Sequence, residues 1–177
     1  MAAAAAPQLA PRVSLREYQL ALSERLQSAQ AGARAASKLG VLAAGESWLV
    51  ELQEASEVLP VQSITPVPLA QPWFRGVANV RGNLYSVTDF SAFAGEKPTT
   101  MSEHARLLIV ADRFRVGAAL LVERSLGLRP AESLKPHAGG ATQPWVKAQY
   151  IDKDGSVWKE LDVAALVQNE SFLEVSL

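Results

Sequence analysis

The stretch ITPVPLAQPWFRGVANVRGNLYSVTDFSAFAG, residues 64–95, decides how the rest of the chain is interpreted. Its prolines cannot donate backbone hydrogen bonds, so they predict an extended connector that leads up to Trp73. Short apolar runs then flank Arg81-Gly82-Asn83. Because Gly82 and Asn83 both tolerate positive φ, we expect two strands joined by a hairpin turn at this point. The turn holds one charged side chain, Arg81, at its tip.

Two interpretations of Arg81 are open from its position alone. A charged group on a tight turn is usually solvated, and recognition of a partner or an internal ion pair is the alternative. After the second strand, Thr88-Asp89-Phe90 predicts a short turn or helix.

These residues also carry a resemblance to a known family. Val67-Pro68, the run 74–82 (FRGVANVRG) and the run 87–90 (VTDF) resemble the signature of CheW-type coupling proteins of bacterial chemotaxis. Within that family, the GVANVRG run and the closing pattern at 172–175 (FLEV) are most similar to the members that serve type IV pilus chemosensory systems. The resemblance covers about residues 40–177.

The resemblance implies both a fold and a function. It implies a mainly β protein made of two small five-stranded β-barrels, side by side around a shared apolar seam. It further implies a non-catalytic adaptor that couples a methyl-accepting chemotaxis protein to the regulatory domain of a CheA-like histidine kinase. The output of such a system would be type IV pilus twitching motility. A β-barrel module that binds some other protein is the alternative function.

The resemblance also implies a set of partner-binding residues. Glu57 and Val58 correspond to the family's receptor-proximal strand end, where Ala55 replaces a larger valine. Among the residues of the hairpin, Asn79 and Gly82 shape the turn. Arg81 supports a receptor-facing groove through an ion pair or a hydrogen bond. We expect one or both of Asp89 and Glu123 to pair with Arg81 or with Arg124, and Glu123 stands where the family has aspartate.

Composition limits the other function classes. The chain has 177 residues, of which 49% are hydrophobic, a formal net charge of −1 and no cysteine. It therefore suits one domain or two small subdomains, with no disulfide, no thiolate catalysis and no charge excess for nucleic acid. His104 and His137 fall in expected loops without metal-ligand spacing, and no nucleophile, phosphate-loop or dinucleotide motif is present. We expect neither an enzyme, nor a cofactor, nor a metal site.

The N-terminal region, residues 1–38, is expected to be a tail followed by a helix and a linker. Ser14 and Glu17 form a capping box, and apolar residues then recur at helical spacing, which predicts a helix from about Ser14 to Ala31. Its apolar stripe either packs on the domain or forms a partner surface. No signal peptide or membrane span is recognisable, so we expect a cytosolic protein recruited to membrane-bound receptor arrays.

The body, residues 39–177, is expected to consist of short strands separated by turn signals, which favours barrels or a sandwich. Expected strands include one at 39–42, one around Trp48 with a single buried face after a Gly45-Glu46 turn, 106–111, 114–122, and a hairpin of 145–151 with 156–161. Residues 55–58 close the first hairpin unit, and 96–104 and 130–142 are loops. Asp162 caps a short helix to about Val167, and 172–177 form a final strand or an extended tail.

Overall fold

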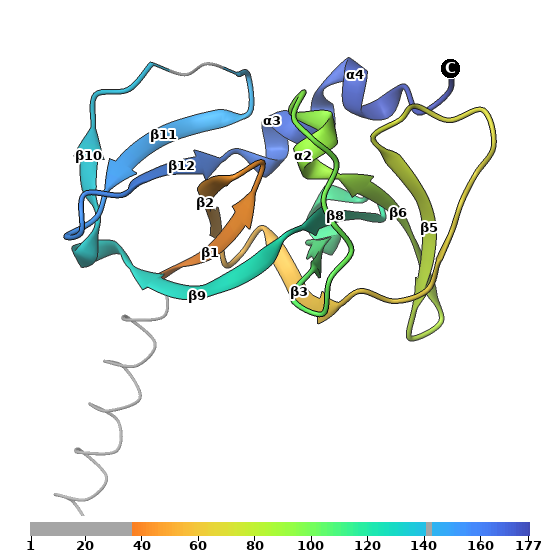
Figure 1. Ribbon diagram of the computed structural model, residues 1–177, viewed down its shortest axis with the longest axis horizontal. Helices are drawn as coiled ribbons and strands as arrows, with labels where there is room; N and C mark the ends of the chain where they lie inside the picture. The colour runs from red at the N-terminus through yellow and green to blue at the C-terminus, as the bar shows by residue number, and fades with distance from the viewer. Residues whose placement is uncertain (1–36, 141–142) are drawn as a thin grey trace, which may run out of the picture. The chain divides into compact units, whose positions relative to one another are not determined.

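The structure of the protein is a computed structural model that describes residues 37–140 and 143–177. The helix expected from Ser14 to Ala31 lies outside the described residues. The described part is mainly β, which confirms the expected fold class, and its strands form two antiparallel-rich sheets (Figure 1).

The first sheet combines the beginning and the end of the described chain. Its strand order is β10-β11-β12-β2-β1-β9. The strands are β1 (Ser37–Ala43), β2 (Glu46–Glu51), β9 (Arg124–Pro130), β10 (Lys135–His137), β11 (Val146–Ile151) and β12 (Val157–Leu161).

The second sheet is built from the middle of the chain. Its strand order is β3-β7-β8-β6-β5-β4. The strands are β3 (Ala55–Pro60), β4 (Ile64–Thr65), β5 (Phe74–Val80), β6 (Asn83–Asp89), β7 (Arg106–Val110) and β8 (Ala118–Val122). Three short α-helices, α2 (Phe90–Phe93), α3 (Val163–Gln168) and α4 (Glu170–Leu173), and two 3-10 turns, η1 (Asp112–Phe114) and η2 (Ala131–Ser133), complete the described elements.

Both sheets curl so that their edge strands approach each other. The edge strands of the first sheet are β9 and β10, and those of the second are β3 and β4. In each sheet the two edge strands are consecutive in the chain. A few connecting residues can join opposite edges only if the sheet is strongly curved. Each described sheet has six strands rather than the expected five, because β4 lies at the start of the proline segment and β10 lies in the expected loop 130–142. His137 accordingly ends a strand.

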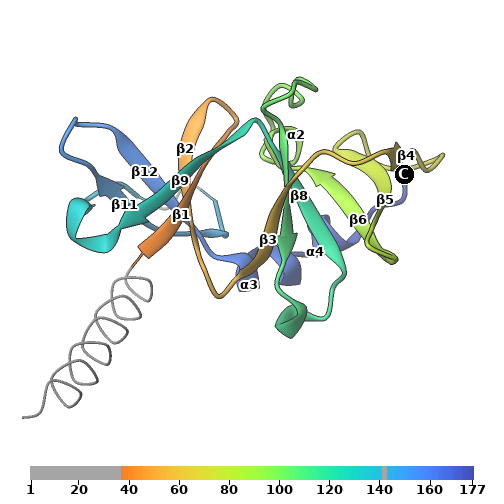
Figure 2. The same cartoon turned by 90° about the horizontal axis from the view of Figure 1, so that it is seen from below.

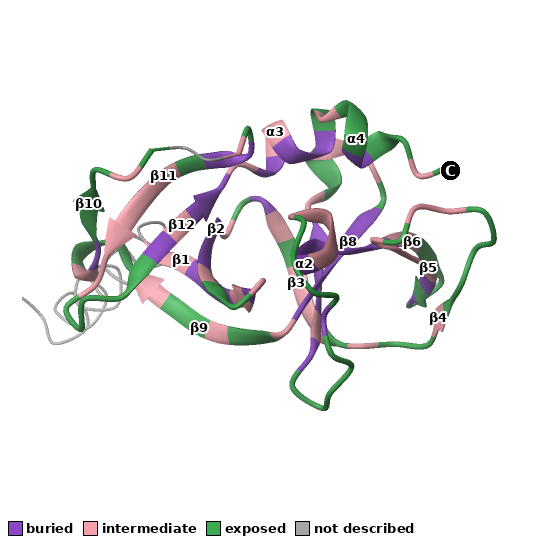
Figure 3. Ribbon diagram, turned by 45° about the horizontal axis from the view of Figure 1, so that its top comes forward, coloured by how far each residue is buried: buried purple, intermediate pink, exposed green. Residues whose placement is uncertain are grey.

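The main apolar core lies between the two sheets and confirms the shared seam (Figure 3). It contains Trp48 and Val50 from β2, Leu120 from β8 and Phe90 from α2, and the Trp48 and Phe90 rings meet edge to face at 4.9 Å. Two smaller clusters fill the separate sheets, one around Leu107 and Leu121 and one around Leu49 and Trp158.

The central strands are therefore buried on both faces. On β2, Trp48 and Val50 face the seam while Leu49 packs inside the first sheet. The expectation that this strand has a single buried face was wrong, because the alternating pattern does not show that a second cluster covers the other side. The continuous apolar run of β7 is confirmed as a doubly buried strand.

Two connections differ from expectation. Residues 55–58 do not close the first hairpin but begin β3, which lies on the side of β8 rather than beside β2 (Figure 2). There, β3 pairs with β7 of the second sheet. The return strand expected at 114–122 begins only at Ala118, because residues 112–114 form η1 and Arg115 takes a left-handed φ of 55°.

The final strand or extended tail expected at 172–177 begins later than predicted, because Phe172 and Leu173 belong to α4 and only residues 174–177 form a non-helical tail. Asp162 caps α3 by accepting from the Ala165 N–H at 2.8 Å, as predicted. Phe172 then lies buried in α4, and the tail that follows hydrogen-bonds the proline segment, with the Gln71 N–H donating to Val175 at 2.8 Å. Trp73 stacks on Phe172 with ring centroids 6.3 Å apart, so this aromatic residue helps to hold the tail.

Candidate docking surface

The β5–β6 hairpin presents Arg81 in a defined orientation. Its turn consists of Arg81 and Gly82, whose φ values are 53° and 90°. The positive-φ pair therefore lies one residue earlier than expected and produces the tight two-residue turn that suits a twisted hairpin. The Asn79 side chain accepts from the Gly82 N–H at 2.8 Å, so Asn79 and Gly82 do shape the turn.

Arg81 forms a two-pronged ion pair with Glu57. Its two terminal nitrogens donate to the two Glu57 carboxylate oxygens at 2.9 and 2.7 Å. The side chains remain 72% and 34% exposed. This pair, which we call the Glu57–Arg81 clamp, ties the hairpin tip to the edge strand β3. The internal ion pair expected as one alternative is confirmed.

Asp89 is not the partner of Arg81. Its side chain is fully buried and accepts from the Thr99 N–H at 2.9 Å and the Thr99 hydroxyl at 2.8 Å. It also caps α2 by accepting from the Ala92 N–H. The expected pairing was wrong because the strand carries Asp89 inward, where it positions the loop after α2. Val58 is likewise turned inward and packs against the seam.

Glu123 is not paired with Arg81 either. It accepts from the Gly45 N–H at 3.0 Å, which joins the end of β8 to the β1–β2 turn. That turn consists of Ala44 and Gly45, both at positive φ, one residue earlier than expected. The Ala44 N–H donates to the Ser91 hydroxyl at 2.7 Å, so α2 supports the same turn.

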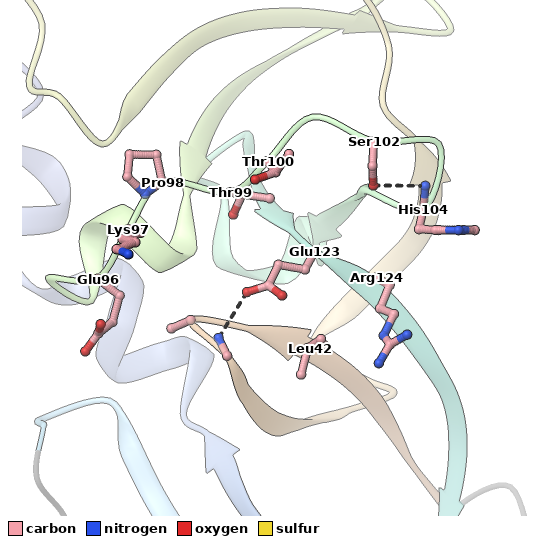
Figure 4. A pocket seen from close by; sticks show the side chains of 12 residues that line it. Leu42, Glu96, Lys97, Pro98, Thr99, Thr100, Ser102, His104, Glu123 and Arg124 are labelled. Carbon is pink, nitrogen blue, oxygen red and sulfur yellow. Dashed lines mark hydrogen bonds between the residues drawn. The ribbon is translucent and has the colours of Figure 1, made fainter.

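Glu123 lines a cleft of about 530 Å³, which we call the junction cleft (Figure 4). Three segments form its walls: the β1–β2 turn of the first sheet, the loop 96–104 of the second, and the β8–β9 connection. Its polar lining residues include Thr99, Thr100, Ser102, His104 and Arg124. The sequence suggested only that 96–104 is a polar loop, because no local pattern shows which loops meet at a cleft.

A second charged cluster lies in the first sheet and was not anticipated. Glu160 on β12 is almost fully buried and accepts from the Lys38 ammonium at 2.6 Å. Lys147 lies 3.4 Å from Glu160 and 2.9 Å from Glu51. The hydrogen bond from Lys147 lowers the pKa of Glu51 and raises that of Lys147, and burial raises the pKa of Tyr150 beside Glu160. These groups satisfy one another and join four strands.

The remaining polar motifs are structural. The 152–155 turn between β11 and β12 is a hairpin, in which Asp152 accepts from the N–H groups of Asp154 and Ser156 and from the Trp158 indole. In the described part of the chain, no group of acidic or histidine side chains is arranged to hold a metal ion. None of the described helices has the length and apolar character needed to cross a membrane.

Comparisons with known proteins agree on one family. The model of the CheW-like domain matches residues 38–171. Protein PilI of Pseudomonas aeruginosa is 27% identical over 161 residues, which cover 88% of this chain and 89% of that protein. The scaffolding protein TtCheW of Thermoanaerobacter tengcongensis has a similar crystal structure, with a TM-score of 0.60 at 21% identity over 72% of this chain and 88% of the other.

Proposed function

The chain belongs to the family of CheW-like domain proteins, and on that premise we propose that it couples a methyl-accepting chemotaxis protein to the regulatory domain of a CheA-like histidine kinase. Proteins of this family are non-catalytic scaffolds, and the chain is a chemosensory adaptor rather than an enzyme. The proposed output is control of type IV pilus twitching motility, which the similarity to PilI supports. The proposed place of action is the cytoplasmic side of membrane-bound receptor arrays.

The Glu57–Arg81 clamp is the observation that carries this proposal. A hairpin whose tip is tied to a neighbouring edge strand presents a fixed charged surface, and exposed charged groups in a fixed geometry favour specific docking. Both side chains of the clamp are accessible to solvent, whereas Glu160 in the other charged cluster is buried.

The partner-binding residues divide into two groups in this proposal. Glu57, Arg81 and Glu123 have accessible polar groups and contact partners directly. Asn79, Gly82, Val58 and Asp89 act by holding the hairpin, the edge strand and the loop 96–104 in place. A rigid β scaffold of this kind transmits a receptor's shift to the kinase through differential contacts, without chemistry of its own.

Reconstitution from purified proteins tests the function. The full chain, a CheA-like kinase and the cytoplasmic fragment of a methyl-accepting receptor are mixed in pairs and together, and complexes are separated by size-exclusion chromatography. We expect the chain to bind both proteins and the kinase to reach the receptor fragment only when the chain is present. Binding to neither protein would contradict the proposal and favour a β-barrel module with a different partner.

A further inference from the structure

We propose that a basic notch at one end of the junction cleft binds a carboxylate side chain of the receptor segment that docks there. The notch is lined by His104, Arg106, Arg124 and Ser125 and has a volume of about 150 Å³. It shares His104 and Arg124 with the cleft. The identity of the partner rests on the proposed function, whereas the preference of the notch for carboxylates does not.

The register of β7 and β8 explains why these side chains converge. Leu108 lies opposite Leu120, and Arg106 lies opposite Val122. Directly opposed residues of an antiparallel pair share one face of the sheet. The ladder ends at this pair, and His104 and Arg124, each two residues beyond it in the chain, line the notch beside Arg106. The face that carries the apolar seam therefore ends in basic side chains where it reaches solvent.

Arg106 is held rigidly by the backbone. Its Nη1 donates to the carbonyl oxygens of Glu103 at 2.7 Å and Ala105 at 2.8 Å. A guanidinium has five N–H groups in a fixed plane, so the groups on Nε and Nη2 are left for a ligand. An arginine fixed in this way binds a carboxylate with less loss of side-chain entropy than a free one.

Arg124 and Ser125 supply the other donors. Arg124 is exposed at the start of β9, on the wall of the cleft (Figure 4). The Ser125 hydroxyl accepts a long hydrogen bond from the Gly127 N–H at 3.4 Å, which leaves its own hydrogen free to donate. Two guanidinium groups and a hydroxyl match the donor set that a carboxylate accepts.

The charge of the notch is not balanced from within the described part of the chain. There, Arg81, Arg113 and Lys147 each pair with a glutamate, but neither Arg106 nor Arg124 forms an ion pair. Two acidic residues adjoin the notch residues in the chain: the Glu103 side chain is 86% exposed and lies 3.5 Å from His104, and Glu123 accepts from the Gly45 N–H. The uncompensated positive charge favours an acidic partner.

Charge reversal of Arg124 tests the notch. The full chain, its Arg124→Glu variant and the control Lys153→Glu are titrated with the receptor fragment and, separately, with a fluorescent oligoglutamate peptide. Lys153 is exposed in the β11–β12 turn, so the control makes the same charge change outside the notch. We expect Arg124→Glu to weaken both interactions about tenfold at low ionic strength, less so at about 0.15 M salt, and the control to leave both unchanged.

The outcomes separate the notch from the proposed function. The proposed carboxylate site would be overturned if Arg124→Glu bound as tightly as the unchanged chain. It would also be overturned if the control Lys153→Glu lost as much affinity as Arg124→Glu. Failure of the unchanged chain to bind the receptor fragment would contradict the proposed function. The preference of the notch for carboxylates would then be tested by the peptide titration alone. Competition by inorganic phosphate as strong as that by the peptide would identify a general anion site and overturn the preference for carboxylates. An Arg124→Gln variant with an intermediate loss would support the proposal.

Discussion

In both sheets the two edge strands are consecutive in the chain, but the two sheets place their charged groups differently. The first sheet encloses Glu160 at 1% exposure between Lys38 and Lys147. The second sheet ties its hairpin to β3 through Arg81 and Glu57, which stay in contact with water. A buried carboxylate needs its partners for stability, whereas an exposed ion pair contributes little to it. The first arrangement therefore serves the fold, and the second is free to serve recognition.

The strongest way to break the second sheet is Gly76→Ala. Gly76 has a φ of 124°, and a Cβ there would overlap the carbonyl of Thr65 on β4. Because both the backbone angle and the space exclude a side chain, we expect a loss of about 3 kcal/mol or more in the free energy of unfolding. Urea denaturation measures it. Gly155→Ala, at positive φ but with no neighbour within 4 Å, is the control and should lose clearly less.

Glu160→Gln tests the buried cluster of the first sheet. The substitution leaves Lys38 and Lys147 near a neutral amide in a buried position, so we expect a loss of about 2–3 kcal/mol. Glu46→Gln is the matched control, because Glu46 pairs with Lys159 but is 47% exposed. A loss for Glu160→Gln no larger than for the control would show that the cluster is not important for stability.

Arg81→Ala is expected to have the smallest effect on stability and to act mainly on binding. Removing an exposed ion pair costs at most about 1 kcal/mol, so the variant should unfold nearly like the unchanged chain. We expect the complex with kinase and receptor fragment to weaken, as followed by size-exclusion chromatography. Substantial unfolding of the variant would instead assign Arg81 to the fold and remove the contrast between the sheets.

Local patterns predicted the elements that depend on neighbouring residues. The Asp-Gly turn between β11 and β12, the Asp162 cap of α3 and the apolar run of β7 follow from turn chemistry, capping and periodicity. The resemblance carried by the signature at 74–82 implied two small five-stranded β-barrels around a shared apolar seam. The turns at Ala44-Gly45 and Arg81-Gly82 were each misplaced by one residue, because the positive-φ pair is the glycine with the residue before it, and neither alanine nor arginine is a residue type that signals positive φ.

The sequence by itself determined that the chain is mainly β, where its main hairpins lie, and that it resembles CheW-type proteins. Tertiary structure alone decided which charges meet. Arg81 and Glu57 are 24 residues apart, and Lys38 and Glu160 are 122 apart, yet each pair is in contact. Periodicity reports which face of a strand is apolar, but the curvature of a sheet and the course of its connections decide what lies opposite that face. For the same reason only the structure showed that Asp89 is buried and that the loop 96–104 forms a wall of the junction cleft.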